Sequence, residues 1–128
     1  MFSIKPAALD DYYDIKSIYE KHGKAISLDN TINIMVARED GFSGIGVYKI
    51  SDNVAIISDI LMEDDNNIQI KYFICKAILN SIDLKGIRDV YCKLPSEEKV
   101  LKMCKFQEQD NKFHLNLTGY FNAPCSHC

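Results

Sequence analysis

The stretch that decides the fold runs from Ile56 to Leu79 and reads IISDILMEDDNNIQIKYFICKAIL. Its apolar first part predicts a central strand, which a short acidic and amide turn joins to a long apolar helix. This order points the free backbone N–H groups of a helix start toward the carboxyl end of that strand. Open α/β folds bind anionic groups at such places, because free N–H donors and the helix dipole both favour phosphate. The stretch therefore predicts where a ligand binds.

The segments before this stretch predict a strand, a helix and then three strands in succession. Apolar residues alternate with polar ones in the first strand of this trio, and short turns rich in Asp, Asn and Gly separate its members. Strands joined by such short turns must form an antiparallel meander. The predicted elements are a strand at Phe2–Lys5, a helix with Tyr12, Ile15, Tyr19 and His22 on its apolar face, and strands at Thr31–Arg38, Ser43–Ser51 and Val54–Met62.

The rest of the chain adds two helices and two strands. The long helix is predicted at Asn66–Asp83, a strand at Val90–Leu94, a short helix from Pro95 to Cys104 and a last strand at Phe113–Thr118. The order β-α-β-β-β-α-β-α-β predicts an α/β (α+β) fold with a mixed sheet and helices on both faces. The predicted core consists of Ile32, Ile34, Val36, Val54, Ile56, Ile60, Phe73, Ile74, Ala77, Val90, Cys92 and Leu115.

Length and composition limit the classes of protein that the chain fits. Its 128 residues suit one domain, predicted to span 1–128. A net charge of −3 argues against a nucleic-acid or anionic-membrane binder, which would present a basic face. The apolar runs are far shorter than the roughly 20 residues of a membrane helix, and no apolar signal-peptide region follows Met1. We therefore predict a cytoplasmic protein, with its five cysteines reduced.

The end of the chain carries soft metal ligands, in Cys125-Ser126-His127-Cys128. A zinc site needs four ligands, usually in two pairs, and the sequence offers no second pair. A redox or metal sensor built on these cysteines stays a third alternative for function. The simpler interpretation is a flexible tail over 121–128 with no metal ligands.

The order of elements resembles the GCN5-related N-acetyltransferase (GNAT) superfamily over nearly the whole chain. Phe2-Ser3-Ile4-Lys5-Pro6-Ala7 is similar to the family's opening strand, and Phe113–Tyr120 fits its final strand. Val100–Phe106 resembles its late helix and turn, with Lys105 in place of the usual glycine. The resemblance implies a GNAT-like, mainly antiparallel sheet. It also implies an N-acetyltransferase that takes acetyl-CoA as co-substrate and acts on an amine of a small molecule or protein.

The resemblance also implies where the acyl-CoA would bind. Its pyrophosphate would lie over the start of the long helix, and its thioester beside the end of the strand before it. In the family's motif, Asn66 stands for an Arg or Gln, and Gln69 and Lys71 for glycines, so none of these positions matches. The acidic run Glu63-Asp64-Asp65 would repel phosphate, or alternatively caps the helix and stabilises its dipole. The implied binding residues are Ile60, Leu61, Met62, Asn66, Asn67, Ile68, Gln69, Ile70 and Lys71.

Acyl transfer to an amine needs a base and, for the departing thiolate, an acid. Asp59, in an otherwise apolar strand, is the predicted base, and its alternative is a surface residue bonded to a neighbour. The family's frequent tyrosine acid falls at Leu101, which cannot serve. The absent glycines and tyrosine keep a second hypothesis open, a non-catalytic module of the same fold that binds or regulates a partner. A homodimer through an exposed edge strand is also expected.

Overall fold

The computed structural model describes residues 2–26 and 30–121, which form one seven-stranded sheet with strand order β1-β2-β3-β4-β5-β7-β6. Three α-helices and two short 3-10 helices, η1 and η2, accompany it in this part of the chain. The strands are β1 (Phe2–Pro6), β2 (Ile32–Glu39), β3 (Phe42–Ser51), β4 (Val54–Met62), β5 (Asp89–Cys92), β6 (Gln107–Gln109) and β7 (Lys112–Asn116). The helices are η1 (Leu9–Asp11), α1 (Tyr12–Lys21), α2 (Ile68–Leu84), η2 (Pro95–Glu97) and α3 (Glu98–Met103).

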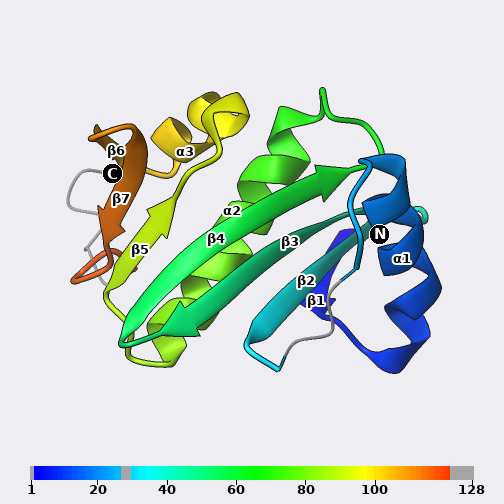
Figure 1. The fold of residues 1–128 in the computed structure, drawn as a ribbon, viewed down its shortest axis with the longest axis horizontal. Coiled ribbons are helices and arrows are strands. Elements are labelled where there is room, and N and C mark those ends of the chain that lie inside the picture. The colour runs from blue at the N-terminus through cyan, green and yellow to red at the C-terminus, as the bar shows by residue number, and fades with distance from the viewer. Residues whose placement is uncertain (1, 27–29, 122–128) are drawn as a thin grey trace.

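The helices lie on both faces of the sheet, as the sequence predicts. In Figure 1, α2 lies behind the sheet and α1 in front of it, near the edge formed by β1 and β2. The larger core joins α2 and α3 to one face, and a smaller core joins α1 to the other face of β2, β3 and β4. Every neighbouring pair of strands is antiparallel except β4 and β5, which run parallel. The predicted mixed, mainly antiparallel sheet is confirmed.

Helix α2 rests directly on β3 because Gly46 has no side chain. A Cβ atom at Gly46 would overlap Ile74 Cγ2 and Ile78 Cδ1, so a larger residue would force these side chains to shift. Ile74 and Ile78 are fully buried against this position. A glycine inside a strand commonly marks such a close approach. Gly46 therefore fixes the distance between the helix and the sheet.

Two of the predicted core residues are exposed. The side chains of Ile56 and Phe73 are 44% and 38% exposed. Ile56 stands between Ala55 and Ile57, which both belong to the larger core, and is itself exposed, and the ring of Phe73 packs against that of Phe2. The helix forms as predicted, but the prediction chose the wrong side of it for Phe73. Val36, Ile60, Ile74, Val90, Cys92 and Leu115 are buried, and Ile32, Ile34, Val54 and Ala77 are half-buried.

One strand was missed, and it changes the edge of the sheet. β6 pairs with β7, so the predicted last strand is covered and β6 forms the edge. All three residues of β6 are polar and exposed, which left no periodic apolar signal to detect. The edge expected to support a homodimer is therefore not the one present, and the dimer stays a prediction. The predicted tail, 121–128, lies outside the described residues except for Phe121.

Candidate functional site

The parallel strands β4 and β5 separate halfway along β4. Their register runs from Val54–Asp89 to Ile57–Cys92 and ends there. At the same point β4 carries a bulge, because Tyr48 and Val47 of β3 pair with Ile57 and Asp59 and leave Ser58 as an extra residue. A bulge bends its strand, which fits the divergence of β4 from β5 in Figure 1. Within the described chain, the end of β4 has a strand partner only on its β3 side.

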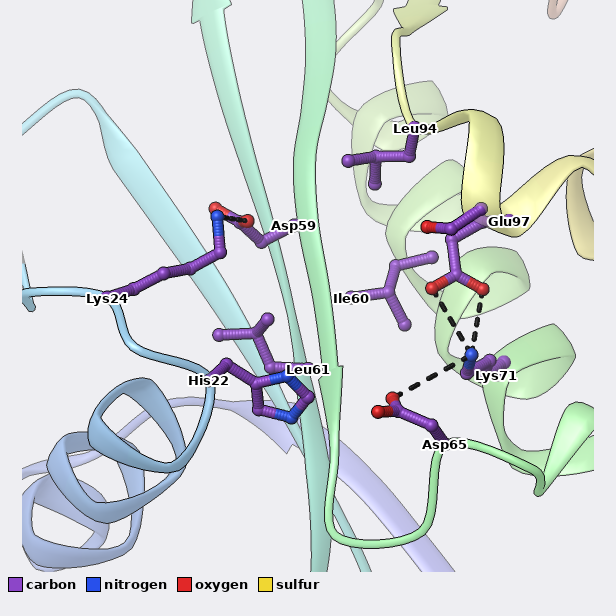
Figure 2. A pocket seen from close by; sticks show the side chains of 10 residues that line it. His22, Lys24, Asp59, Ile60, Leu61, Asp65, Lys71, Leu94 and Glu97 are labelled. Atoms are coloured by element: carbon purple, nitrogen blue, oxygen red, sulfur yellow. Dashed lines mark hydrogen bonds and ion pairs between the residues drawn. The ribbon is translucent and has the colours of Figure 1, made fainter.

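A cleft of about 450 Å³ occupies the space where the strands diverge. Its residues come from both layers of the fold: α1 and the loop after it, β4, the start of α2, and the segment after β5. Figure 2 shows these side chains on the two sides of β4. Two reactants could therefore approach the end of β4 from opposite faces of the sheet. The cleft is lined by His22, Lys24, Asp59, Ile60, Leu61, Asp65, Lys71, Leu94, Ser96 and Glu97.

The α1 side of the cleft holds the predicted base. The Asp59 carboxylate is 18% exposed and forms an ion pair with Lys24 Nζ at 3.1 Å. Nearby, His22 Nε2 lies 3.0 Å from the carbonyl oxygen of Met62, and it must donate because a carbonyl only accepts. Burial raises the pKa of the Tyr19 phenol, and the Asp59 carboxylate raises it further. The Tyr19 phenol therefore holds its proton more tightly than a free tyrosine does.

The α2 side of the cleft holds a buried ion pair. Lys71 Nζ lies 2.8 and 3.2 Å from the two carboxylate oxygens of Glu97, and both residues are more than nine-tenths buried. The Asp65 carboxylate lies farther away, at 3.9 Å. Each buried charge is stabilised by the other, because an unpaired charge here would lose the free energy of its hydration and gain no ion pair in return. The positive charge of Lys71 is thus already neutralised and does not offset the acidic run before α2.

Five N–H groups at the start of α2, those of residues 66–68, 70 and 71, have acceptors within the chain. Asp64 Oδ1 accepts from the backbone N–H of Asn66, and the Asp64 carbonyl accepts from that of Asn67. The Asn67 side chain then caps the helix by accepting from the N–H of Ile70. The N–H groups of Ile68 and Lys71 also have backbone acceptors. The Asp64 carboxylate and the Asn67 amide occupy donors that a phosphate cradle would leave free, so the start of α2 does not fit a pyrophosphate in this conformation.

The predicted binding residues therefore divide into two groups. Asp59, Ile60, Leu61 and Lys71 line the cleft, and Met62 meets His22 through its carbonyl. Asn66, Asn67, Ile68, Gln69 and Ile70 are absent from the residues that line it. Their expected place beside the ligand stays a prediction.

Sequence reasoning missed five residues of the cleft: His22, Lys24, Leu94, Ser96 and Glu97. Only one signal could have pointed to any of them. Lys71 stands between Ile70 and Tyr72 in a helix that is apolar on nearly every side, so a buried carboxylate partner was to be expected. Nothing in the sequence identifies that partner as Glu97, 26 residues later. The sequence pattern places His22 on the apolar face of its helix, whereas in the structure it is the C-cap residue of α1.

Helix α3 and the turn after it match the family's pattern in backbone conformation but not in side-chain chemistry. Lys105 has a φ of 73°, in the left-handed region that favours glycine, the residue usual at this position in the family. Leu101, at the position of the usual tyrosine, is fully buried in the larger core. No proton donor for a leaving group stands there. Cys125, His127 and Cys128 lie outside the described residues.

Comparison with known proteins supports the fold at low sequence similarity. No family model and no curated protein matches the chain. Among solved structures, an N-acetyltransferase from Staphylococcus aureus superposes with a TM-score of 0.73 at 13% identity, covering 91% of this chain and 99% of that one. The ribosomal-protein-S18-alanine N-acetyltransferase from Escherichia coli gives 0.72 at 9% identity and 90% of both chains.

A spermidine N-acetyltransferase chimera from Vibrio cholerae and hSSAT gives a TM-score of 0.70 at 12% identity, over 94% of this chain and 99% of that one. With the strand order and the diverging β4 and β5, these matches define the class: the chain has the fold of GNAT acetyltransferases. At these identities the likeness concerns the fold alone. No helix among the described residues is long and apolar enough to cross a membrane.

Proposed function

We propose that the protein is an N-acyltransferase that moves an acetyl group from acetyl-CoA, or a related thioester, to an amine. One observation carries the proposal: the cleft between β4 and β5 combines free strand backbone, an ionisable carboxylate and access from both faces. The thioester supplies an activated acyl carbonyl, and the chain must supply position, a base and N–H donors. The cleft fits the acyl end of such a donor, whereas the start of α2 does not fit its pyrophosphate.

The end of β4 supplies the electrostatic part of the mechanism. The backbone N–H groups of successive residues in a strand point to alternate sides. Some of the N–H groups of residues 58–62 therefore point away from β3 and toward the cleft. Such donors stabilise the negative charge that develops on a carbonyl oxygen under attack. His22 holds the Met62 carbonyl from the α1 side, which fixes the end of the strand.

Asp59 is the proposed base. An amine attacks only when deprotonated, and a carboxylate in the cleft can accept the proton as the new N–C bond forms and the thioester C–S bond breaks to release the CoA thiolate. Lys24 Nζ, 3.1 Å away, orients that carboxylate, and the amine of an acceptor would have to displace it. The cleft lining holds three carboxylates against two lysines, a balance that favours a cationic acceptor such as an amine over an anionic one.

The test compares Asp59→Asn with Asp52→Asn, a control in the exposed turn between β3 and β4. Release of free CoA from acetyl-CoA is followed by chromatography with a panel of primary amines. We expect Asp59→Asn to lower the rate by about 100-fold or more, the usual size of a general-base contribution. The control should keep the wild-type rate. An equal rate in wild type and Asp59→Asn would remove Asp59 from the mechanism.

The second candidate is a non-catalytic module of the same fold. The internally bonded N–H groups at the start of α2 favour it, together with Leu101 in place of a tyrosine. Thermal unfolding with and without CoA separates the two, because a ligand that binds only the native state must raise Tm. With no shift at millimolar CoA and no CoA release with any amine, the module would be the better description.

A further inference from the structure

A second hollow lies beside the cleft, on the front of the sheet. It has a volume of about 470 Å³ and shares Leu94 with the cleft. Figure 1 shows no helix in front of β5 and β7, so this part of the described sheet is open. We call this hollow the front groove, and it is lined by Ile56, Ile57, Ser58, Tyr91, Cys92, Lys93, Leu94 and Lys112.

The floor of the front groove is apolar and exposed. Ile56 of β4 and Tyr91 of β5 are register partners, so their side chains lie next to each other on the same face. Ile56 is 44% exposed, and the ring of Tyr91 stacks on that of His114 with 4.6 Å between centroids. An apolar chain laid across these side chains would remove their surface from water, which is favourable in proportion to the area covered.

Two lysines form the rim of the front groove, and neither has a carboxylate partner in the described chain. The register pairs Cys92 of β5 with Phe113 of β7, so Lys93 and Lys112 are the next residues along and share the open face. Lys112 Nζ lies 4.9 Å from the centre of the Tyr91 ring. Like charges opposite each other on a sheet destabilise it, and a bound anion would remove that repulsion.

One carboxylate on this face is already engaged elsewhere. Asp89, on the same face of β5, accepts from Asn116 and lies 2.9 Å from His114 Nε2. These contacts hold the pKa of Asp89 below its usual value, with the His114 hydrogen bond the largest cause. In the cleft, by contrast, Lys24 and Lys71 are both paired with carboxylates. The two sites thus have opposite character, an acidic cleft and a basic groove that share Leu94.

We infer that the front groove binds the body of the acceptor, which is an amine that also carries an apolar chain and a carboxylate. The inference rests on the proposed function, because the amine must reach Asp59. The apolar chain would cover Ile56 and Tyr91, and the carboxylate would meet Lys93 and Lys112. Asp59 lies three positions after Ile56 along β4, a span of about 10 Å at roughly 3.3 Å per residue. The acceptor is therefore longer than an α-amino acid and matches an ω-amino acid or a short peptide.

The test uses ε-aminocaproate as the probe and hexylamine, which lacks the carboxylate, as its matched partner. Both are titrated into the full chain without CoA, and binding is followed by the backbone NMR signals of Ile56 and Tyr91. Wild type should bind ε-aminocaproate about tenfold more tightly than hexylamine, a difference of about 1.4 kcal/mol that two exposed ion pairs can provide. The difference should shrink as salt is raised.

The variant Lys93→Gln/Lys112→Gln should remove that preference while leaving hexylamine binding unchanged. Lys99→Gln, an exposed lysine on α3, is the control and should keep the preference. Equal binding of the two probes by wild type, or no binding of either, would overturn the inference. Movement of the Ile56 and Tyr91 signals with protein concentration alone would also overturn it, because a second copy of the chain would then cover the groove. The absence of CoA separates any of these failures from a failure of the Asp59→Asn transfer assay.

Discussion

The two walls of the cleft differ in how many of their polar groups already have a partner within the chain. On the α2 wall, Asp64 and Asn67 accept from the helix-start amides, and Lys71 and Glu97 neutralise each other in a buried pair. On the β4 wall, the strand loses its β5 partner after Ile57, and its carboxylate and backbone face the cleft. Under the proposed function, acyl transfer would occur in the cleft at the end of β4, and this part of the fold is open. At the same time, the chain has filled the place where a phosphate would be held.

The largest expected effect comes from breaking the buried pair on the α2 wall. Glu97→Gln should lower the free energy of unfolding by about 3–5 kcal/mol, because Lys71 would keep a buried charge without a partner. Urea unfolding followed by circular dichroism measures the change. The double variant Lys71→Met/Glu97→Leu should recover most of the loss, since apolar residues of similar volume often replace a buried pair at little cost. A single variant as stable as wild type would mean that water reaches Lys71.

The next largest effect compares the stability lost by truncating a buried residue of α2 with that lost by truncating a partly exposed one. Ile74→Ala should cost about 2–5 kcal/mol, because Ile74 is fully buried against Gly46 and the change leaves a cavity. Phe73→Ala should cost less, since its ring is 38% exposed, although burial of Phe73 was predicted from the sequence. Both are measured by the same urea unfolding. A greater loss for Phe73→Ala would show that the contact with Phe2 matters more than burial.

A smaller effect should sharpen the comparison at the start of α2. Asp64→Asn/Asp65→Asn should strengthen CoA binding by about 0.3–1 kcal/mol for each charge removed from the helix start, and more at low salt. Asn at position 64 can still accept the Asn66 N–H, so the turn should survive. Gln69→Gly should help further by clearing the approach to the backbone. Calorimetry at two salt concentrations measures the binding.

In that titration, CoA binding that is unchanged in both variants would show that acidic repulsion does not limit the α2 wall. Binding absent from wild type and from both variants would take most of the support from the enzyme proposal.

The smallest effect concerns how α1 is attached to the sheet. His22, at the end of α1, contacts the β4 wall through the Met62 carbonyl. Arg38 Nη2 donates to Asp11 at 2.7 Å and to Asp14 at 2.8 Å. The hydrogen bond from Arg38 is the largest of the causes that lower the pKa of Asp11 in the folded chain. The stability that this hydrogen bond contributes is therefore fully present above the pKa of Asp11 in the unfolded chain, near 3.8. It is lost as the pH falls through the lower pKa of Asp11 in the folded chain.

Arg38→Met should reduce the loss of stability on acidification in that range, as measured by thermal unfolding at a series of acidic pH values. A wild-type acid profile in this variant would show that Arg38 does not anchor α1.

Much of the fold could be predicted from local signals alone. The turn Ser51-Asp52-Asn53 was expected from its residues, and Asp52 and Asn53 both take positive φ there. β4 was predicted with its observed bounds, because a long apolar run between two strong turn signals has one simple interpretation. The predicted start of α2 was early by two residues, since Asn67 caps the helix instead of beginning it. The short polar strand β6 gave no local signal.

The sequence by itself determined the order of the elements, the sheet with helices on both faces, and the place of Asp59 within the central strand. These follow from periodicity, capping and turn chemistry, which act between neighbours in the chain. The tertiary structure alone decided the pairing of Lys71 with Glu97, of Lys24 with Asp59, and of Lys93 beside Lys112. Electrostatic and desolvation energies depend on distances in space, and the chain fixes those distances only when strands far apart in sequence take their register.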